Sequence, residues 1–191
     1  MSTRRKMLAA DERIANRIVD MAKRRESTVY QTVNDILEQA LRVEEMGLSL
    51  DEVVSERGMI EKARKMGLTF TMENLLYDVV ELAYDNSKDK LSEMWREVGS
   101  WYGKFFSNKA NDGMEYFEEA MTLMTLGNPV FNIERGKEGI VTVSCVGEGF
   151  SSGFTSVLSL FIEGVFETFG MKLDDKENSK GIIRLRFKTP R

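Results

Sequence analysis

The sequence predicts an α+β protein in three parts: two short helices over residues 1–47, a helical connector over 48–70, and a C-terminal α+β domain over 71–191. In the C-terminal domain we expect an antiparallel sheet packed on helices. Three observations predict this class. Apolar residues recur at helical spacing along the first 47 residues. Two β-branched runs flank the turn Arg135–Gly139. The chain has only two prolines and no Ser/Gly-rich linker.

The first two helices follow from cap residues and apolar spacing. Asp11 can cap a helix that ends near Arg25. Its apolar face carries Ile14, Ile18, Met21 and Ala22. Thr28 and Gln31 have capping-box spacing, and the second helix runs on to a stop at Gly47. Two helices of roughly four turns bury too little apolar surface to be stable alone, so we expect a homodimer.

A basic segment precedes this helix pair, and residues 4–41 resemble the ribbon-helix-helix repressors of the Arc and MetJ type. In that family the leading strand pairs with its twin in the DNA major groove, and the start of the second helix anchors a phosphate. The resemblance implies contacts with double-stranded DNA by Arg4, Arg5, Lys6, Leu8, Ser27 and Thr28.

The predicted strand departs from the family pattern because it lacks β-branched residues. Aligning the helices places Lys6 and Leu8 inward, whereas aligning polarity places Met7 and Ala9 inward. The side chains that face the bases therefore stay open.

Charge is concentrated where DNA contact is predicted. The first 25 residues hold eight Lys or Arg and three Asp or Glu, although the whole chain has a formal charge of −4. A local basic patch predicts salt-dependent binding to DNA. The alternative is a helical hairpin that only dimerises and carries a solvated, charged tail.

The connector begins with a capping box at Ser49 and Glu52, pauses at Gly58 and ends at Gly67. From residue 71 onward the predicted order is α-α-α-β-β-α-β-β. The predicted helices lie near residues 72–84, 91–106, 114–126 and 153–169, and the strands near 130–134, 140–146, 171–173 and 182–187.

This order and three segments resemble the 4-vinyl reductase-type domain, which shares its fold with TRAPP-type trafficking subunits. The segments are Val98–Gly103, Gly127–Val130 and Phe161–Gly170. The resemblance implies a pocket for a small apolar ligand between helices and sheet. We expect seven aromatic residues to line it: Trp95, Trp101, Tyr102, Phe105, Phe131, Phe154 and Phe161. The alternative for each ring is ordinary core packing.

Several classes of chemistry are disfavoured. The chain has no histidine, which excludes Ser-His-Asp and Cys-His catalysis, His-ligated haem and the usual zinc sites. Its single cysteine, Cys145, lies in an apolar run and is expected to be a buried small hydrophobe. Glu163 and Glu167 share a helix face but read equally well as a solvated stripe. We expect no enzyme activity, cofactor or metal site.

The glycine-rich run Gly147–Gly153 follows a strand, as a dinucleotide loop does. Its third glycine is one position late, so a flexible turn is the better interpretation. The apolar helix after it is interrupted by glutamates and serines, which favours a buried core helix over a membrane span. The N-terminus has no signal-peptide pattern, and we expect a cytoplasmic protein.

Together these features predict a homodimeric DNA-binding transcription regulator that senses a small apolar ligand through its C-terminal domain. A dimeric scaffold or assembly protein of the TRAPP-like fold, without DNA binding, is the alternative.

Overall fold

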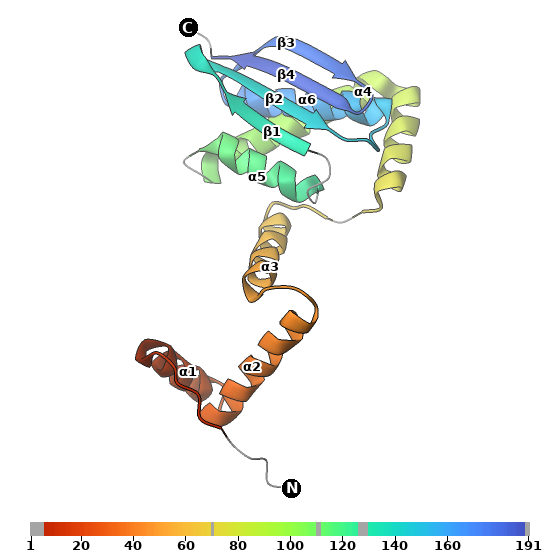
Figure 1. Cartoon of the computed structure of the whole chain (residues 1–191). Helices are drawn as coiled ribbons and strands as arrows, with labels where there is room; N and C mark the ends of the chain where they lie inside the picture. Colours follow the sequence, from red (N-terminus) through yellow and green to blue (C-terminus); the bar gives the residue numbers. More distant parts are fainter. Residues whose placement is uncertain (1–5, 70, 110–111, 126–129, 190–191) are drawn as a thin grey trace. The chain divides into compact units, whose positions relative to one another are not determined.

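A computed structural model describes residues 6–69, 71–109, 112–125 and 130–189. It divides the chain into two compact units, Met1–Met59 and Ile60–Arg191, which are described separately (Figure 1). The described residues form α-helices and one antiparallel sheet of four strands, which confirms the α+β class and the sheet packed on helices. Within the described residues, no helix combines the length and the apolar character needed to cross a membrane.

Local capping chemistry sets the helix ends in the first unit. Helix α1 spans Glu12–Arg24, and the Arg13 N–H donates to Asp11 Oδ1 at 2.9 Å. Helix α2 spans Val29–Glu45, and the Gln31 N–H donates to Thr28 Oγ1 at 3.1 Å. Gly47 follows α2 with a φ of +75°, the left-handed conformation that glycine adopts readily. The predicted caps and stop are confirmed.

The segment ahead of α1 is neither helix nor strand over residues 6–11. Lys6 and Leu8 are exposed there, while Arg4 and Arg5 lie outside the described residues. A ribbon of the expected kind forms only when two chains pair, because a strand needs a neighbour for its backbone hydrogen bonds. The single chain shows no ribbon in the part described, and the ribbon stays a prediction.

Helix α3 spans Leu50–Lys65 without a break, so the predicted pause at Gly58 is wrong. A single glycine lowers the stability of a helix by only about 1 kcal/mol, which is too little to end a helix whose N-terminus is well capped. The start is a reciprocal capping box. The Ser49 N–H donates to Glu52 Oε2 at 2.6 Å, and the Glu52 N–H donates to Ser49 Oγ at 3.2 Å. The helix is followed by Gly67, whose φ is +78°.

The second unit has the predicted element order. Its helices are α4 (Glu73–Lys109), α5 (Gly113–Thr125) and α6 (Ser152–Thr168), and a short 3₁₀ turn covers Lys137–Gly139. Helix α4 contains both helices predicted at its position. They meet at a kink at Ser87, where φ is −153° and ψ is 50°.

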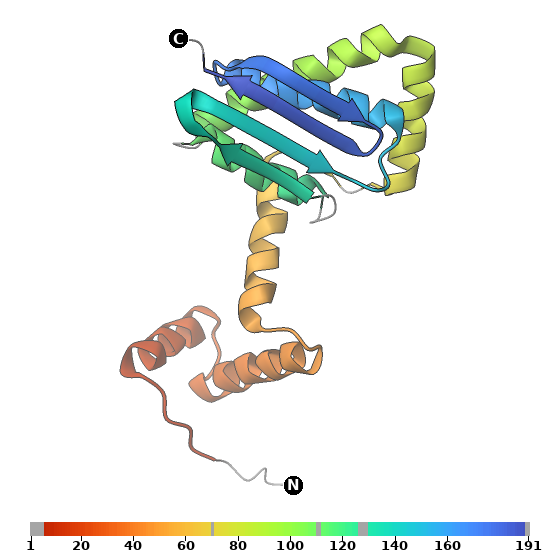
Figure 2. The same cartoon turned by 45° about the horizontal axis from the view of Figure 1, so that its top comes forward.

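The sheet has the strand order β1-β2-β4-β3, and every neighbouring pair is antiparallel. The strands are β1 (Val130–Arg135), β2 (Ile140–Val146), β3 (Lys172–Ser179) and β4 (Ile182–Lys188). Helices cover one face of the sheet, and the other face is open (Figure 2). Along β4, residues alternate between exposed and fully buried, with Ile183, Leu185 and Phe187 turned toward the helices.

Strand β3 is longer than predicted. It reaches Ser179, whereas the sequence predicts only residues 171–173. Nearly all of its side chains are exposed, because it lies at the sheet edge and is rich in charged residues. Such an edge strand lacks the apolar alternation by which strands are identified, and its charges discourage pairing with other chains.

Helix α6 is the centre of the second unit, since 12 of its 17 residues are buried. It packs along α4 with very little space between the two backbones. A Cβ at Gly99 would collide with the backbone of Phe161, and one at Gly164 with the backbone of Arg96. Gly103 faces Val165 and Thr168 in the same way. Glycine is therefore required at these three positions.

The thiol of Cys145 is predicted to resist chemical modification. Cys145 is fully buried, and burial raises the pKa of its thiol to about 12. At pH 8 the native protein should react with a maleimide at least tenfold more slowly than the urea-unfolded chain, measured by mass spectrometry. Equal rates in the two states would contradict this packing.

Candidate functional site

The N-terminal hairpin, defined as α1, α2 and the turn between them, buries almost no apolar side chain. Ala22 is the only buried hydrophobic residue among the described residues of the first unit. Val29, Ile36 and Leu37 lie on the apolar side of α2 but are each 37% exposed or more, and Leu41 is 62% exposed. Exposed apolar surfaces of this kind are typical of protein–protein interfaces.

The same hairpin carries exposed cations. Six lie in it, namely Arg13, Arg17, Lys23, Arg24, Arg25 and Arg42, and the exposed Lys6 lies just ahead of it. None of the ion pairs of the described residues involves any of these six. Ser27 and Thr28 stand at the start of α2, where Thr28 is its cap. The first backbone N–H groups of a helix have no intrahelical acceptor, and the site favours anions.

The seven predicted ligand residues belong to one continuous aromatic cluster in the second unit. Trp95 contacts Phe154 and Phe161 at ring-centroid distances of 5.7 and 6.5 Å. Tyr102 lies 5.9 Å from Phe161. Trp101 and Phe105 stack at 5.7 Å, with an angle of 10° between their planes.

Phe131 joins this cluster through Phe117, a residue that the sequence did not single out. Phe117 is fully buried and contacts four other rings at the centre of the core: Phe106, Phe131, Phe161 and Phe166. Trp101 lies at the other extreme, since 58% of its surface is exposed. The rings thus pack on one another from core to surface. None of the seven predicted residues lines the cavity on the open face of the sheet or the cavity along α5.

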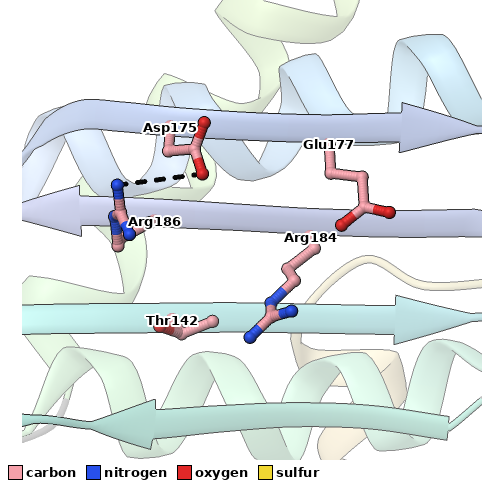
Figure 3. Close-up of a pocket in the computed structure, with 5 residues that line it drawn as sticks. All are labelled: Thr142, Asp175, Glu177, Arg184 and Arg186. Carbon is pink, nitrogen blue, oxygen red and sulfur yellow. Dashed lines mark ion pairs between the residues drawn. The ribbon is translucent and has the colours of Figure 1, made fainter.

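One cavity, of about 230 Å³, lies on the open face of the sheet (Figure 3). Thr142 from β2, Arg184 and Arg186 from β4, and Asp175 and Glu177 from β3 line it. Arg186 is held by carboxylates, since its Nε donates to Asp174 Oδ2 at 2.8 Å. Lys188 and Arg186 together hold the pKa of Asp174 below its usual range. Arg184 has no ion pair within the described part of the chain.

A second cavity, of about 670 Å³, lies along α5 and the end of α3. Its lining includes the acidic residues Asp112, Glu115, Glu118 and Glu119. Most of these carboxylates have partners: Asp112 pairs with Arg135 at 2.5 Å, Glu119 with Lys62, and Glu118 accepts the Ile133 N–H at 3.0 Å. Arg135 lowers the pKa of Asp112. Across the described residues, no group of three or more carboxylate or thiol side chains is placed to hold a metal ion.

The glycine-rich run Gly147–Gly153 forms the connection from β2 to α6. The Gly153 N–H donates to Glu81 Oε2 at 2.8 Å, and Ser151 Oγ accepts the Phe154 N–H at 3.1 Å. A carboxylate therefore occupies the start of α6, the position that a phosphate takes in a dinucleotide loop. This favours the interpretation as a structural turn.

Glu163 is the residue that the sequence interpretation missed. The interpretation of Glu163 as part of a solvated stripe is wrong, because only 3% of Glu163 is exposed. Its carboxylate pairs with Arg96 of α4 at 2.5 Å and with Lys176 of β3 at 2.6 Å. Arg96 also pairs at 2.6 Å with Glu167, which is exposed as a solvated stripe requires. The available signal was the position of Glu163 between apolar residues of a helix that is apolar nearly all round, since a buried charge needs a partner.

Comparison with known proteins leaves the family open. No protein-family model matches the chain, and no curated protein does. Among solved structures, one from a study of haem distortion in the H-NOX family is 15% identical with a TM-score of 0.43, covering 69% of this chain and 84% of that one. A Cs H-NOX mutant with 4-cyano-L-phenylalanine is 18% identical with a TM-score of 0.41, covering 69% and 85%. A T. tengcongensis H-NOX mutant is 18% identical with a TM-score of 0.40, covering 69% and 86%. Similarity at this level supports no inference about ligand or function.

Removing Arg96 and Lys176, the two cations that pair with Glu163, is predicted to destabilise the second unit more than neutralising Glu163 itself. The double substitution Arg96→Met with Lys176→Met leaves a buried, unpaired carboxylate, at a cost of about 3–5 kcal/mol in the free energy of unfolding. Glu163→Gln leaves two cations that reach water and should cost about 1–3 kcal/mol. Urea unfolding measures both. A loss of unfolding free energy that is larger for Glu163→Gln than for the double substitution would contradict the prediction. The matched control is Lys90→Met with Lys180→Met, which removes two cations at exposed positions.

Proposed function

We propose that the chain is a homodimeric DNA-binding transcription regulator. Its N-terminal hairpin pairs with a second copy and binds double-stranded DNA, and its C-terminal α+β unit responds to a small apolar ligand. The observation that carries the proposal is the composition of the hairpin surface. It exposes apolar residues on α2 together with six cations, and it buries one hydrophobic residue.

Dimerisation follows from this imbalance. A unit that leaves Ile36, Leu37 and Leu41 exposed has little core of its own. Burying such side chains is worth roughly 1.5–3 kcal/mol each, so a second copy of the same surface would supply the missing stability. A two-fold pair also brings both leading segments together, which a paired strand requires.

DNA is the partner that the charges favour. The unpaired cations of the hairpin, with Arg4 and Arg5 ahead of them in the sequence, match a phosphate backbone, although the chain as a whole is acidic. Thr28 caps the helix whose first N–H groups would face a phosphate. A dimer doubles both features and sets them at a fixed spacing, as a pseudo-palindromic operator requires.

The ligand-binding part of the proposal rests on the aromatic cluster. Trp95, Phe154 and Phe161 join α4 to α6 through ring contacts, and Trp101 carries the cluster to the surface. An apolar molecule that enters between these rings would change how the two helices pack. Binding that favours one of two packings is the general basis of such a response.

The dimer is tested at Leu41. Leu41→Glu adds a charge at a position that is largely exposed in the single chain, so it should change the stability of a monomer by no more than about 0.5 kcal/mol. In the proposed dimer it buries a charge at the contact, and we expect at least tenfold weaker self-association of the full chain by sedimentation. Gln39→Glu, on the opposite side of α2, is the charge-matched control. Equal behaviour of the two variants would contradict the contact.

DNA binding is tested with the full chain and genomic fragments by fluorescence anisotropy at 50–200 mM salt, roughly the range over which phosphate contacts weaken strongly. The triple substitution of Arg4, Arg5 and Lys6 to Ala should weaken binding more than tenfold. It should also lower the slope of log affinity against log salt by about 2 to 5, since each chain loses three cations.

The control replaces Lys90, Lys137 and Lys180 of the second unit by Ala, which removes the same charge and should leave affinity within about twofold of wild type. If the N-terminal triple variant binds as the wild type does, or if no DNA binds at any salt, the regulator proposal fails. A protein that still dimerises in that case is the scaffold alternative.

A further inference from the structure

The C-terminal half of α4 carries a second apolar surface, which the aromatic cluster only partly explains. Met94, Val98 and Trp101 are 51%, 46% and 58% exposed. With Phe105, which is half-buried, they follow the i, i+4, i+7, i+11 spacing of one helix face. We call these four residues the α4 stripe.

The α4 stripe points away from its own domain. The face of α4 against α6 is marked by Gly99 and Gly103, both buried. At 100° per residue, the centre of the stripe lies about 130° around the helix from Gly99 and about 170° from Gly103. The unit's own core therefore covers only the Phe105 end of the stripe and leaves Met94, Val98 and Trp101 exposed. Trp101 lies next to the middle of this stripe, and tryptophan is one of the residues that dominate protein–protein contacts.

Two unpaired charges flank the stripe on the same side. Glu97 and Lys104 lie about 70° and 90° around the helix from its centre, in the same direction. Both are exposed, and neither has an ion pair within the described residues. Glu97 lies toward the start of the stripe and Lys104 toward its end.

We propose that the α4 stripe is a homodimer contact in which two copies of α4 pack antiparallel about a two-fold axis between Val98 and Trp101. In such a pair the same flank of each helix faces its copy. Glu97 then meets Lys104 of the partner subunit, and the reciprocal pair forms on the other side of the axis. Met94 lies opposite Phe105 of the partner subunit. One surface therefore supplies both members of each ion pair.

Charge selects this orientation. A parallel pair would place the charged flank of one helix against the opposite flank of the other, which carries Tyr102 and Trp95. Both of these are half-buried rings of the aromatic cluster. Glu97 would then have no cation opposite it, so the antiparallel pair is the arrangement in which the flanking charges find partners. This contact lies wholly within the second unit and does not require the N-terminal hairpin.

The orientation is tested by single cysteines in the full chain, crosslinked with a short bis-maleimide. Two copies of Val98→Cys are offset by only about 4–5 Å along the helix axis and should crosslink efficiently. Two copies of Met94→Cys are offset by about 16 Å and should not. The wild type, whose single cysteine is buried, gives the background. Crosslinking at both positions would mean a parallel pair, and crosslinking at neither would mean no self-contact here. Either result overturns the proposal.

Charge exchange tests the ion pairs. In the Val98→Cys background, Glu97→Lys or Lys104→Glu places like charges opposite each other twice and should lower the crosslinked yield about threefold to tenfold. Mixing the two single-exchange proteins, or combining both exchanges in one chain, should restore it. No recovery in either case overturns the pairing. Loss of DNA binding in the N-terminal triple variant leaves this readout unchanged, so the failure of the proposed function and the failure of this contact are told apart.

Discussion

The close contact between α4 and α6 is the constraint on which the second unit depends. Gly99, Gly103 and Gly164 let the two backbones meet where any Cβ would collide. Once α6 is held this way, its other sides must meet the sheet and α5, which is why 12 of its 17 residues are buried. The same contact fixes the rotation of α4, so Met94, Val98 and Trp101 can only face outward. The buried core and the exposed stripe therefore both result from the close packing of α4 against α6.

The two units differ in the interactions that define their structure. The second unit has a continuous core of aromatic and β-branched side chains that joins helices and sheet, and its buried charge, Glu163, is held by Arg96 and Lys176. The first unit has caps in place of a core. Asp11, Thr28 and Gly47 define its helices locally, but local definition does not offset the entropy of ordering about 40 residues. The proposed contact with a second copy would supply the apolar burial that this unit lacks.

This difference explains which features the sequence predicted well. Caps and stops depend on residues within one turn, so those of α1 and α2 were predicted correctly. Long apolar patterns likewise gave α6, β2 and β4. The misses need tertiary information. Strand β3 is charged because it is an edge, and Glu163 is buried because of two cations distant in sequence. The α4 stripe and the hairpin surface are identified only once exposure is known.

The two proposed self-contacts together impose a geometric condition on the dimer. A closed dimer can use the hairpin and the α4 stripe together only if both contacts share one two-fold axis; otherwise the copies link into open chains. The segment that must meet this condition is α3, which joins the units and buries none of its own residues. A ligand that alters the packing of α4 on α6 would move the α4 stripe, and with it the axis of the second contact. Only through α3 would that change reach the hairpin proposed to bind DNA, so coupling between the two proposed functions would depend on the stiffness of this exposed helix.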